Sequence, residues 1–262
     1  SCTLAAGRCD LTTATLPAGT RSLVARYAGF GTFQPSTSAT LSYVVAKASS
    51  RTRITAVPSS PAYGGLVTLT VRVDSALARP GGTVAVSDGT TPIGSCTLAA
   101  IDATTGGCDV TTATLPAGGR SVGATYLGST DFLGSSATPA LVSVAQATTT
   151  TTLTSSSPSS IFGGPVTLTV SVVGANGTRP AGTVTVYDGG ASIGTCTLTD
   201  GTCPVVRSDL TAGIHSIVAI AAGDTNHLGS TSAPFAQTVA KAATPAAVVA
   251  SPASSSYGQA VT

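Results

Sequence analysis

Several residue types that most globular domains use are scarce or missing here. The 262 residues include no Met and no Trp; aromatic residues make up 4% and charged residues 8% of the chain. That charged share is about a third of the usual one, and the formal net charge is only +2. This near-neutral composition shows no electrostatic footprint for nucleic acid or anionic membrane. No apolar run approaches the roughly 18–20 residues of a transmembrane helix.

What the chain does contain is a long internal repeat, which decides the architecture before any residue is given a role. The stretch RPAGTVTVYDGG after Thr178 resembles RPGGTVAVSDGT after Ala78, and SCTLAAGRCDLTTATLPAG at the start recurs from Ser95. The matching residues give a period of about 97. We therefore expect complete repeats at 48–145 and 146–241, the second half of a repeat at 1–47, and the first strands of another at 242–262. On this interpretation the chain is a segment of a longer protein.

Within a repeat the hydrophobic period is two. Val166, Leu168, Val170 and Val172 alternate with Thr and Ser, which predicts a strand with one buried and one wet face. Further short β-branched segments follow, each closed by turn residues such as Asp188-Gly189. Seven or so strands in about 97 residues, without a helical pattern, predict an all-β fold of tandem immunoglobulin-like two-sheet antiparallel sandwiches. A β-barrel with a similar number of strands is the alternative.

The junctions between repeats are short. Val45-Ala46-Lys47-Ala48 and Val144-Ala145-Gln146-Ala147 run directly into the next repeat, with no Gly/Ser spacer or long Pro run. We expect such connections to hold the sandwiches end to end as an elongated rod.

The six cysteines form one pair per repeat, and the pairs are the main candidate structural site: Cys2 with Cys9, Cys96 with Cys108, and Cys196 with Cys203. Six residues separate the first and third pairs, which would place two sulfurs opposite each other across a hairpin and on its core face. Free buried thiols and a zinc site are the alternatives, but two cysteines without a nearby His supply too few zinc ligands. Disulfides predict an extracellular or cell-surface location.

Two tyrosines occupy equivalent places near the end of the penultimate strand, Tyr27 in ARYAG and Tyr126 in ATYLG. We interpret them as structural aromatics at a sandwich corner, with the hydroxyl bonded to backbone. A role as binding aromatics is the alternative. The third repeat has Ala221 there, so the fold does not require the tyrosine.

The two histidines vary between repeats. His215 stands where Arg21 and Arg120 stand, which predicts an outward surface position, and His227 follows a turn that begins at Gly223. No Ser–His–Asp set and no pair of carboxylates recurs, so we expect no catalytic residues, no metal and no cofactor.

The third repeat contains two further candidate sites, one for calcium and one for glycosylation. Asp224 and Asn226 could bind calcium, but calcium needs six or more oxygen ligands. Asn176-Gly177-Thr178 is a glycosylation sequon.

The segments GTVTVYDG, IGTCTL and PVTLTVSV resemble bacterial immunoglobulin-like (BIG-type) repeats, the tandem modules of large surface and secreted "Ig-like domain repeat" proteins. The resemblance covers both whole and both partial repeats. It implies stalk or spacer modules without active sites, whose partners are further repeats of the same chain, self-association into fibres, or a host or matrix ligand. The Tyr before a Gly-Asp turn is lost at Ala221, and the Asp is lost at Phe30 and Ser129. The cysteine pairs look like additions to the common pattern.

We therefore expect a structural, non-catalytic segment of a long extracellular tandem-repeat protein: a stalk, spacer or fibre of an adhesin, filament or matrix protein. The alternative is a glycan- or protein-binding module acting through sandwich-end loops such as 101–106, where the second repeat has extra residues. A third hypothesis is that residues 1–47 and 242–262 of different chains complete one another. We disfavour it because such a domain would lack a central strand.

Overall fold

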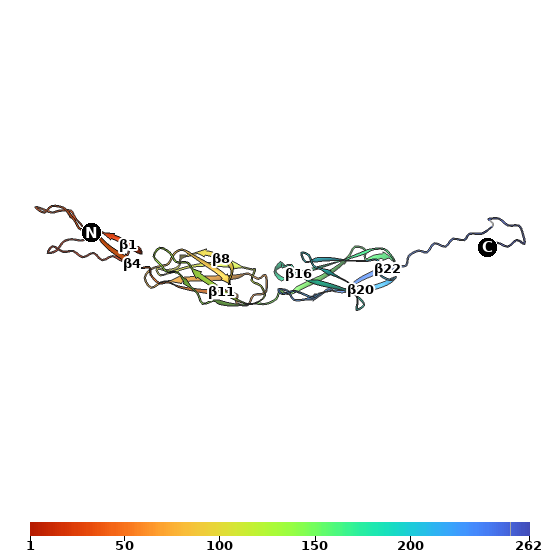
Figure 1. Cartoon of the computed structure of the whole chain (residues 1–262). Helices are drawn as coiled ribbons and strands as arrows, with labels where there is room; N and C mark the ends of the chain where they lie inside the picture. The colour runs from red at the N-terminus through yellow and green to blue at the C-terminus, as the bar shows by residue number, and fades with distance from the viewer. Residues whose placement is uncertain (252) are drawn as a thin grey trace. The chain divides into compact units, whose positions relative to one another are not determined.

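The structure is a computed structural model that describes residues 1–251 and 253–262 and divides into two compact units, Ser1–Gln146 and Ala147–Thr262. Each unit contains one complete sandwich of two β-sheets (Figure 1). The helical structure in the described residues is the single 3-10 turn η1 (Ala175–Gly177). No described helix is long and apolar enough to cross a membrane. The all-β, antiparallel sandwich class predicted from the alternation is confirmed.

The sandwich of the first unit consists of a sheet in the order β5-β6-β10-β9 packed on a sheet in the order β12-β11-β7-β8, with β13 also pairing β11. The named pairs are antiparallel. The strand bounds are β5 (Arg51–Val57), β6 (Val67–Asp74), β7 (Thr83–Asp88), β8 (Thr91–Thr97), β9 (Ala99–Ala100), β10 (Thr105–Thr112), β11 (Gly118–Tyr126), β12 (Ser135–Ser136) and β13 (Ala140–Val144).

The sandwich of the second unit repeats this arrangement, with the strand β15 added and without a counterpart of β9. Its sheets have the orders β14-β16-β19 and β15-β22-β20-β17-β18, with β21 also pairing β20. The added strand β15 pairs in parallel with β22. The bounds are β14 (Thr149–Ser155), β15 (Ser159–Ile161), β16 (Val166–Gly174), β17 (Thr183–Asp188), β18 (Ala191–Thr197), β19 (Thr202–Arg207), β20 (Gly213–Ala221), β21 (Ser230–Thr231) and β22 (Phe235–Ala240).

Each sandwich has its own hydrophobic core, and the alternating residues build it. Val67, Leu69, Val71 and Val73 of β6 are completely buried, while the Thr and Arg side chains between them face outward. In the second sandwich β16 contributes Leu168 in the same way. The absence of Trp and Met is tolerated because closely packed Val and Leu on two facing sheets fill a core about 10 Å thick.

The sequence did not predict β15, and a buried glutamine explains how its segment is held. Gln237 of β22 is 0% exposed. Its Oε1 accepts the Ser155 hydroxyl at 2.7 Å, and its Nε2 donates to the Ser157 carbonyl at 2.8 Å. The chain crosses between the two sheets at this point, from β14 to β15. The first sandwich has Val142 at the matching place. Its corresponding segment forms an isolated bridge, Ala62 to Ala145, and accepts hydrogen bonds from the amides of Ser143 and Ala145 at Ser59 and Pro61.

Replacing this glutamine should destabilise the second sandwich. Gln237→Leu keeps roughly the same volume but leaves the Ser155 hydroxyl and the Ser157 carbonyl without their partner, which should cost about 1–2 kcal/mol in urea unfolding. Ser155→Ala, which removes one of these partners only, should cost less. If Gln237→Leu unfolds with a free energy equal to or above that of the wild type, the Ser155 hydroxyl and the Ser157 carbonyl must reach water. The glutamine would then not stabilise the segment between β14 and β15.

Outside the two sandwiches the described chain forms little regular secondary structure. Residues 1–47 form two small antiparallel pairs, β1 (Gly19–Leu23) with β4 (Leu41–Val45) and β2 (Arg26–Tyr27) with β3 (Ser36–Thr37). They leave a hollow lined by Leu, Val, Tyr and Phe side chains that a complete repeat would bury. Among the described residues after Ala240 there is no strand, and Val248, at the place of core residue Ile54, is 97% exposed.

Candidate functional site

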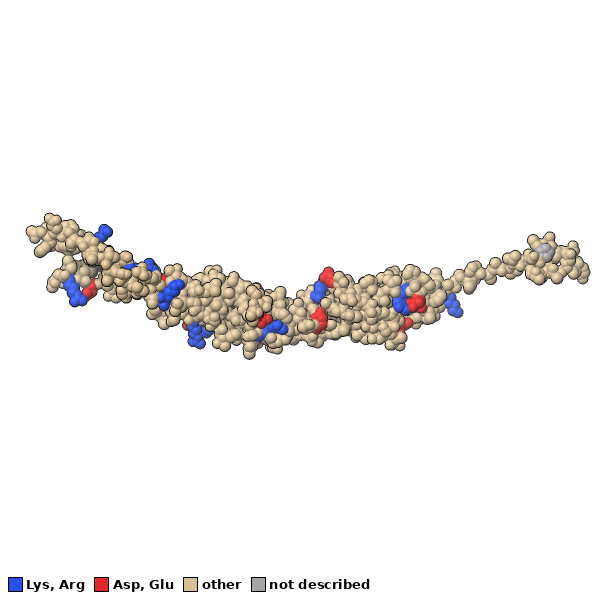
Figure 2. Space-filling view, viewed as in Figure 1, with Lys and Arg blue, Asp and Glu red and all other residues tan. Residues whose placement is uncertain are grey.

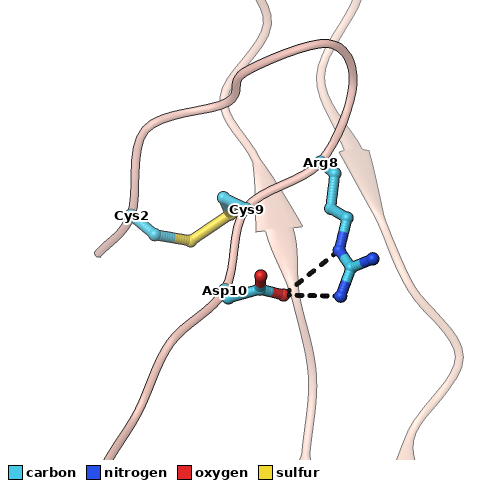
Figure 3. Close-up of a disulfide and its surroundings, with 4 residues drawn as sticks. All are labelled: Cys2, Arg8, Cys9 and Asp10. Atoms are coloured by element: carbon cyan, nitrogen blue, oxygen red, sulfur yellow. Dashed lines mark hydrogen bonds and ion pairs between the residues drawn. A yellow bond between two sulfur atoms is a disulfide. The ribbon is translucent and has the colours of Figure 1, made fainter.

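The structure contains three disulfides, Cys2–Cys9, Cys96–Cys108 and Cys196–Cys203, and there is no free cysteine in the described residues. Figure 3 shows the first of them beside the exposed ion pair of Arg8 with Asp10. All three have Cα atoms 5.8–5.9 Å apart, the spacing usual for disulfides.

The expectation that a disulfide joins the two strands of one hairpin is wrong for the two complete sandwiches, whereas Cys2 and Cys9 flank the antiparallel bridge of Ala5 with Arg8. Cys96 lies on β8 and Cys108 on β10, and these strands belong to different sheets. Cys196 on β18 and Cys203 on β19 repeat this arrangement. The short turn at Thr199 carries the chain from one sheet to the other, so the disulfide bridges the two sheets at an open side of the sandwich. The half-buried Cys96 and the buried Cys203 both pack against the core.

Tyr126 lies at the end of β11 and is 1% exposed. Its hydroxyl donates to the carbonyl of Gly81 at 2.6 Å, so it is a buried residue that ties β11 to the segment before β7. Tyr27, its counterpart in the incomplete repeat, is half-buried. The Tyr126 ring is therefore no exposed platform for a ligand, whereas Tyr27 lines the hollow of residues 1–47.

The extra residues between β9 and β10 form a compact turn. The Asp102 carboxylate accepts the amides of Thr104 and Thr105 at 2.8 and 2.7 Å. Hydrogen bonds from Thr104 lead the effects that lower the pKa of this exposed carboxyl below its ordinary value. Ile101 is 46% exposed at the base of the turn.

The predicted outward position of His215 is wrong, because the residue is buried at 9% exposure. Its Nδ1 lies 2.6 Å from the Asp188 carboxylate and its Nε2 lies 2.7 Å from the Thr211 carbonyl. Both partners are acceptors, so the imidazole is satisfied only when both nitrogens carry hydrogen. In the first sandwich Arg120 makes matching contacts to the Ala117 carbonyl and to Asp88. The sequence comparison identified the equivalence correctly, but arginine at the other positions suggested exposure.

This difference predicts a pH dependence that is confined to the second sandwich. The hydrogen bond to the Thr211 carbonyl, and then the interaction with Asp188, raise the pKa of His215 above its ordinary value, while burial opposes them. A raised folded-state pKa gives stabilisation that is complete below about pH 6.5 and is lost as pH rises through the folded value. We expect a loss of roughly 1.5 kcal/mol between pH 6 and 9, measured by urea unfolding at each pH.

His215→Arg is the matched control for this prediction, because it copies Arg120 and does not titrate in this range. The variant should flatten the pH dependence of the second sandwich and leave the first unchanged. An identical slope in the variant and the wild type would contradict the assignment to His215.

His227 is also buried, at 4% exposure, and stands where the first sandwich has Phe132. Its Nδ1 lies 2.9 Å from Asp224 Oδ1, and its Nε2 lies 2.9 Å from the Thr178 hydroxyl. The order Asp–His–Thr is that of a nucleophilic triad. The Thr178 hydroxyl, however, also lies 2.8 Å from the Ala175 carbonyl, which can only accept. Its proton is therefore directed to the backbone, away from His227, so the group is not activated for attack.

The hydrogen bonds of Asp224 are those of a structural cap. Burial pushes the pKa of its carboxyl upward, but the amides of Ala181 and Asn226 and the His227 ring outweigh it, so the pKa is lowered overall. Across the described residues, no group of three or more His, Cys, Asp or Glu side chains is placed to hold a metal ion. Asn176 of the sequon lies in η1 with a φ of 58° and is exposed.

Solved structures that match this chain include fibronectin(III)-like modules and adhesins. The fibronectin(III)-like modules of Clostridium thermocellum CbhA match at 18% identity and a TM-score of 0.29, covering 72% of this chain and 94% of that one. The Yersinia pseudotuberculosis adhesin InvE matches at 16% and 0.38, covering 70% and 58%. The Escherichia coli adhesin FdeC matches at 13% and 0.29, covering 77% and 68%. No curated protein matches the chain.

The model of the bacterial Ig-like domain (group 3) family matches residues 54–145 and 153–240. The two matches together take up more than half of the chain and coincide with the two complete sandwiches. The chain therefore belongs to the bacterial Ig-like domain (group 3) family.

Proposed function

We propose that this chain is a structural, non-catalytic part of an extracellular tandem-repeat protein of bacteria, in which Ig-like modules act as spacers of a stalk, fibre or matrix. The observation that carries the proposal is what the two sandwiches share. They share a Val- and Leu-rich core, a disulfide between the sheets, and a charged contact from β11 or β20 to the turn before it. All of these serve folding.

The residues that differ between the sandwiches support the same proposal. His215, His227 and Gln237 make several hydrogen bonds each inside the second sandwich. At the matching positions the first sandwich has an arginine, a phenylalanine and a valine, which make different internal contacts. The disulfides favour an oxidising, extracytoplasmic location.

Force spectroscopy of the whole chain tests the spacer function. Two unfolding events are expected, one for each sandwich. In each, the residues enclosed by the disulfide remain locked. Reduction should release them, lengthening one event by roughly 35 Å and the other by roughly 20 Å at about 3.5 Å per residue. The sequence separations of the disulfides are 12 and 7, and the intact bridges already span 5.9 and 5.8 Å between Cα atoms. Sandwiches that extend without measurable resistance would contradict a load-bearing function.

A second candidate function is adhesion through the Ile101–Gly106 turn. It is favoured by one observation: the turn exposes an isoleucine on a segment that the second sandwich lacks. Replacing the turn with Thr199-Asp200-Gly201 of the second sandwich should abolish saturable binding on a glycan array if the turn is the site. Saturable binding that survives the replacement would contradict adhesion through this turn.

A further inference from the structure

Three arginines lie together on the outer face of the first sandwich. Arg51 and Arg53 are two residues apart on β5, so their side chains leave the same face of the sheet about 7 Å apart. Arg72 of β6 pairs directly with Arg53. All three residues are exposed.

Most of the charge in this cluster has no partner. Arg53 donates to the Asp74 carboxylate, with Nη2 2.6 Å from Oδ1. In the described residues, no hydrogen bond or ion pair is found for the guanidinium groups of Arg51 and Arg72. Asp74 also faces Arg51 in the register, and two further carboxylates lie nearby: Asp109, which pairs with Thr70 in the next row of the sheet, and the exposed Asp102 of the inserted turn. What distinguishes the cluster is therefore two guanidinium groups that are open to solvent.

Folding does not require these arginines. Like charges directly opposite one another in an antiparallel pair are destabilising, and Arg53 faces Arg72 in this way. The second sandwich has Thr152 and Ser171 at the matching pair and forms the same sheet. The first sandwich thus carries a like-charged pair that the same sheet of the second sandwich forms without.

The inserted turn reaches the same surface. Gly107 of β10 is the register partner of Arg72. A Cβ atom placed on Gly107 would meet Cδ1 of Ile101 and would lie 2.9 Å from Nη1 of Arg72. The side chains of Ile101 and Arg72 therefore both lie over the backbone of Gly107. Together they place an apolar side chain next to a guanidinium group. Both the turn and the arginine cluster occur in the first sandwich and not in the second.

We propose that this face, formed by Arg51, Arg53, Arg72 and Ile101, binds an acidic polysaccharide that carries carboxylate or sulfate groups. Guanidinium groups bind both anions through two parallel hydrogen bonds, and the Ile101 side chain offers an apolar surface to the sugar ring. Nucleic acid fits less well, because the face lacks aromatic side chains on which bases stack. The spacer function stands whether or not this face binds a ligand.

Titration calorimetry of the whole chain tests the proposal with three polymers. Heparin is the sulfated probe, polygalacturonate the carboxylated probe, and dextran the neutral control. The variant R51T/R53T/R72S carries the residues of the second sandwich at all three positions, so it should fold. A charge-matched control, R8T/R26T/R179S, removes three exposed arginines elsewhere and gives the same net charge.

We expect at least one acidic polymer to bind the wild type and dextran not to bind. Its affinity should fall roughly tenfold for Arg72→Ser alone and about 100-fold or more for R51T/R53T/R72S. The control variant should change it by less than about threefold. Absence of binding by both acidic polymers would overturn the proposal. Equal weakening in the two triple variants would also overturn it, because it would mean that the polymers are attracted to any basic region of the chain.

A variant that preserves the positive charge tests the proposed binding even if the triple substitution impairs folding. R51K/R53K/R72K retains three positive charges but loses the planar guanidinium groups that donate two parallel hydrogen bonds, so it should weaken binding without abolishing it. Unchanged affinity in this variant would overturn the bidentate contacts on which the proposal depends. Figure 2 shows how few charged groups lie on the face of the molecule that is in view.

Discussion

Leu168→Ala should lower the free energy of unfolding of the second sandwich by about 3–4 kcal/mol and leave the first sandwich unaffected. Leu168 is completely buried at the centre of β16, among core residues that all lie in the second unit. The substitution removes the transfer free energy of the lost methyl groups and leaves a cavity that strands on both sides of β16 prevent from closing. Chemical denaturation followed by NMR signals of each sandwich would measure the two transitions separately.

The reciprocal variant and a surface variant control this prediction. Leu69→Ala, at the matching place in β6, should shift the first transition by a similar amount and leave the second alone. Thr169→Ala, on the outer face next to Leu168, should change neither by more than about 0.5 kcal/mol. If either leucine variant moved both transitions equally, the two cores would not be independent folding units.

The strands that form the cores could be predicted because their signal is local. Alternation over Val166–Val172 requires only that one face be buried, and the observed β16 follows it residue by residue. The same reasoning missed β15, because Ser159–Ile161 has no alternation of its own and is held by Gln237, far along the chain. A three-residue parallel strand that pairs with a segment far along the chain leaves no periodic trace in the sequence.

The cysteine spacing illustrates a different limit. Six intervening residues fit a hairpin, and the turn at Thr199 does close with hydrogen bonds between Thr199 and Thr202. Sequence spacing cannot tell whether the chain after such a turn returns to the same sheet or continues into the facing one. It continues into the facing sheet, because β18 pairs with β17 and β19 pairs with β16.

The positions of charged residues were the least accessible to sequence reasoning. Arg53 and Arg72 are 19 positions apart, and only the register of β5 with β6 places them opposite each other. His215 was misplaced for a related reason, since its burial depends on Asp188 and Thr211 closing over it. Electrostatic contacts between strands depend on the register, which composition and period do not determine.

The second large effect concerns the disulfides. Replacing both cysteines of a pair by alanine should cost about 3 kcal/mol for Cys96–Cys108 and about 2.5 kcal/mol for Cys196–Cys203, because the longer loop loses more entropy when it is closed. Each loss should appear in the urea unfolding of its own sandwich, with the other sandwich as an internal control. Reduction of the wild type should reproduce both losses together.

The site of these disulfides makes the effect local as well as global. The β8 and β10 strands share no hydrogen-bonded ladder, so besides side-chain packing only the disulfide and the short β9–β10 pairing that follows β8 close that side of the sandwich. In the Cys96→Ala/Cys108→Ala variant we therefore expect amide exchange in β8 to accelerate far more than exchange in β11, at the centre of the same sheet. Equal acceleration in both strands would mean that the disulfide acts only on the unfolded chain. A loss below about 1 kcal/mol would mean that core packing already holds the sheets together without it.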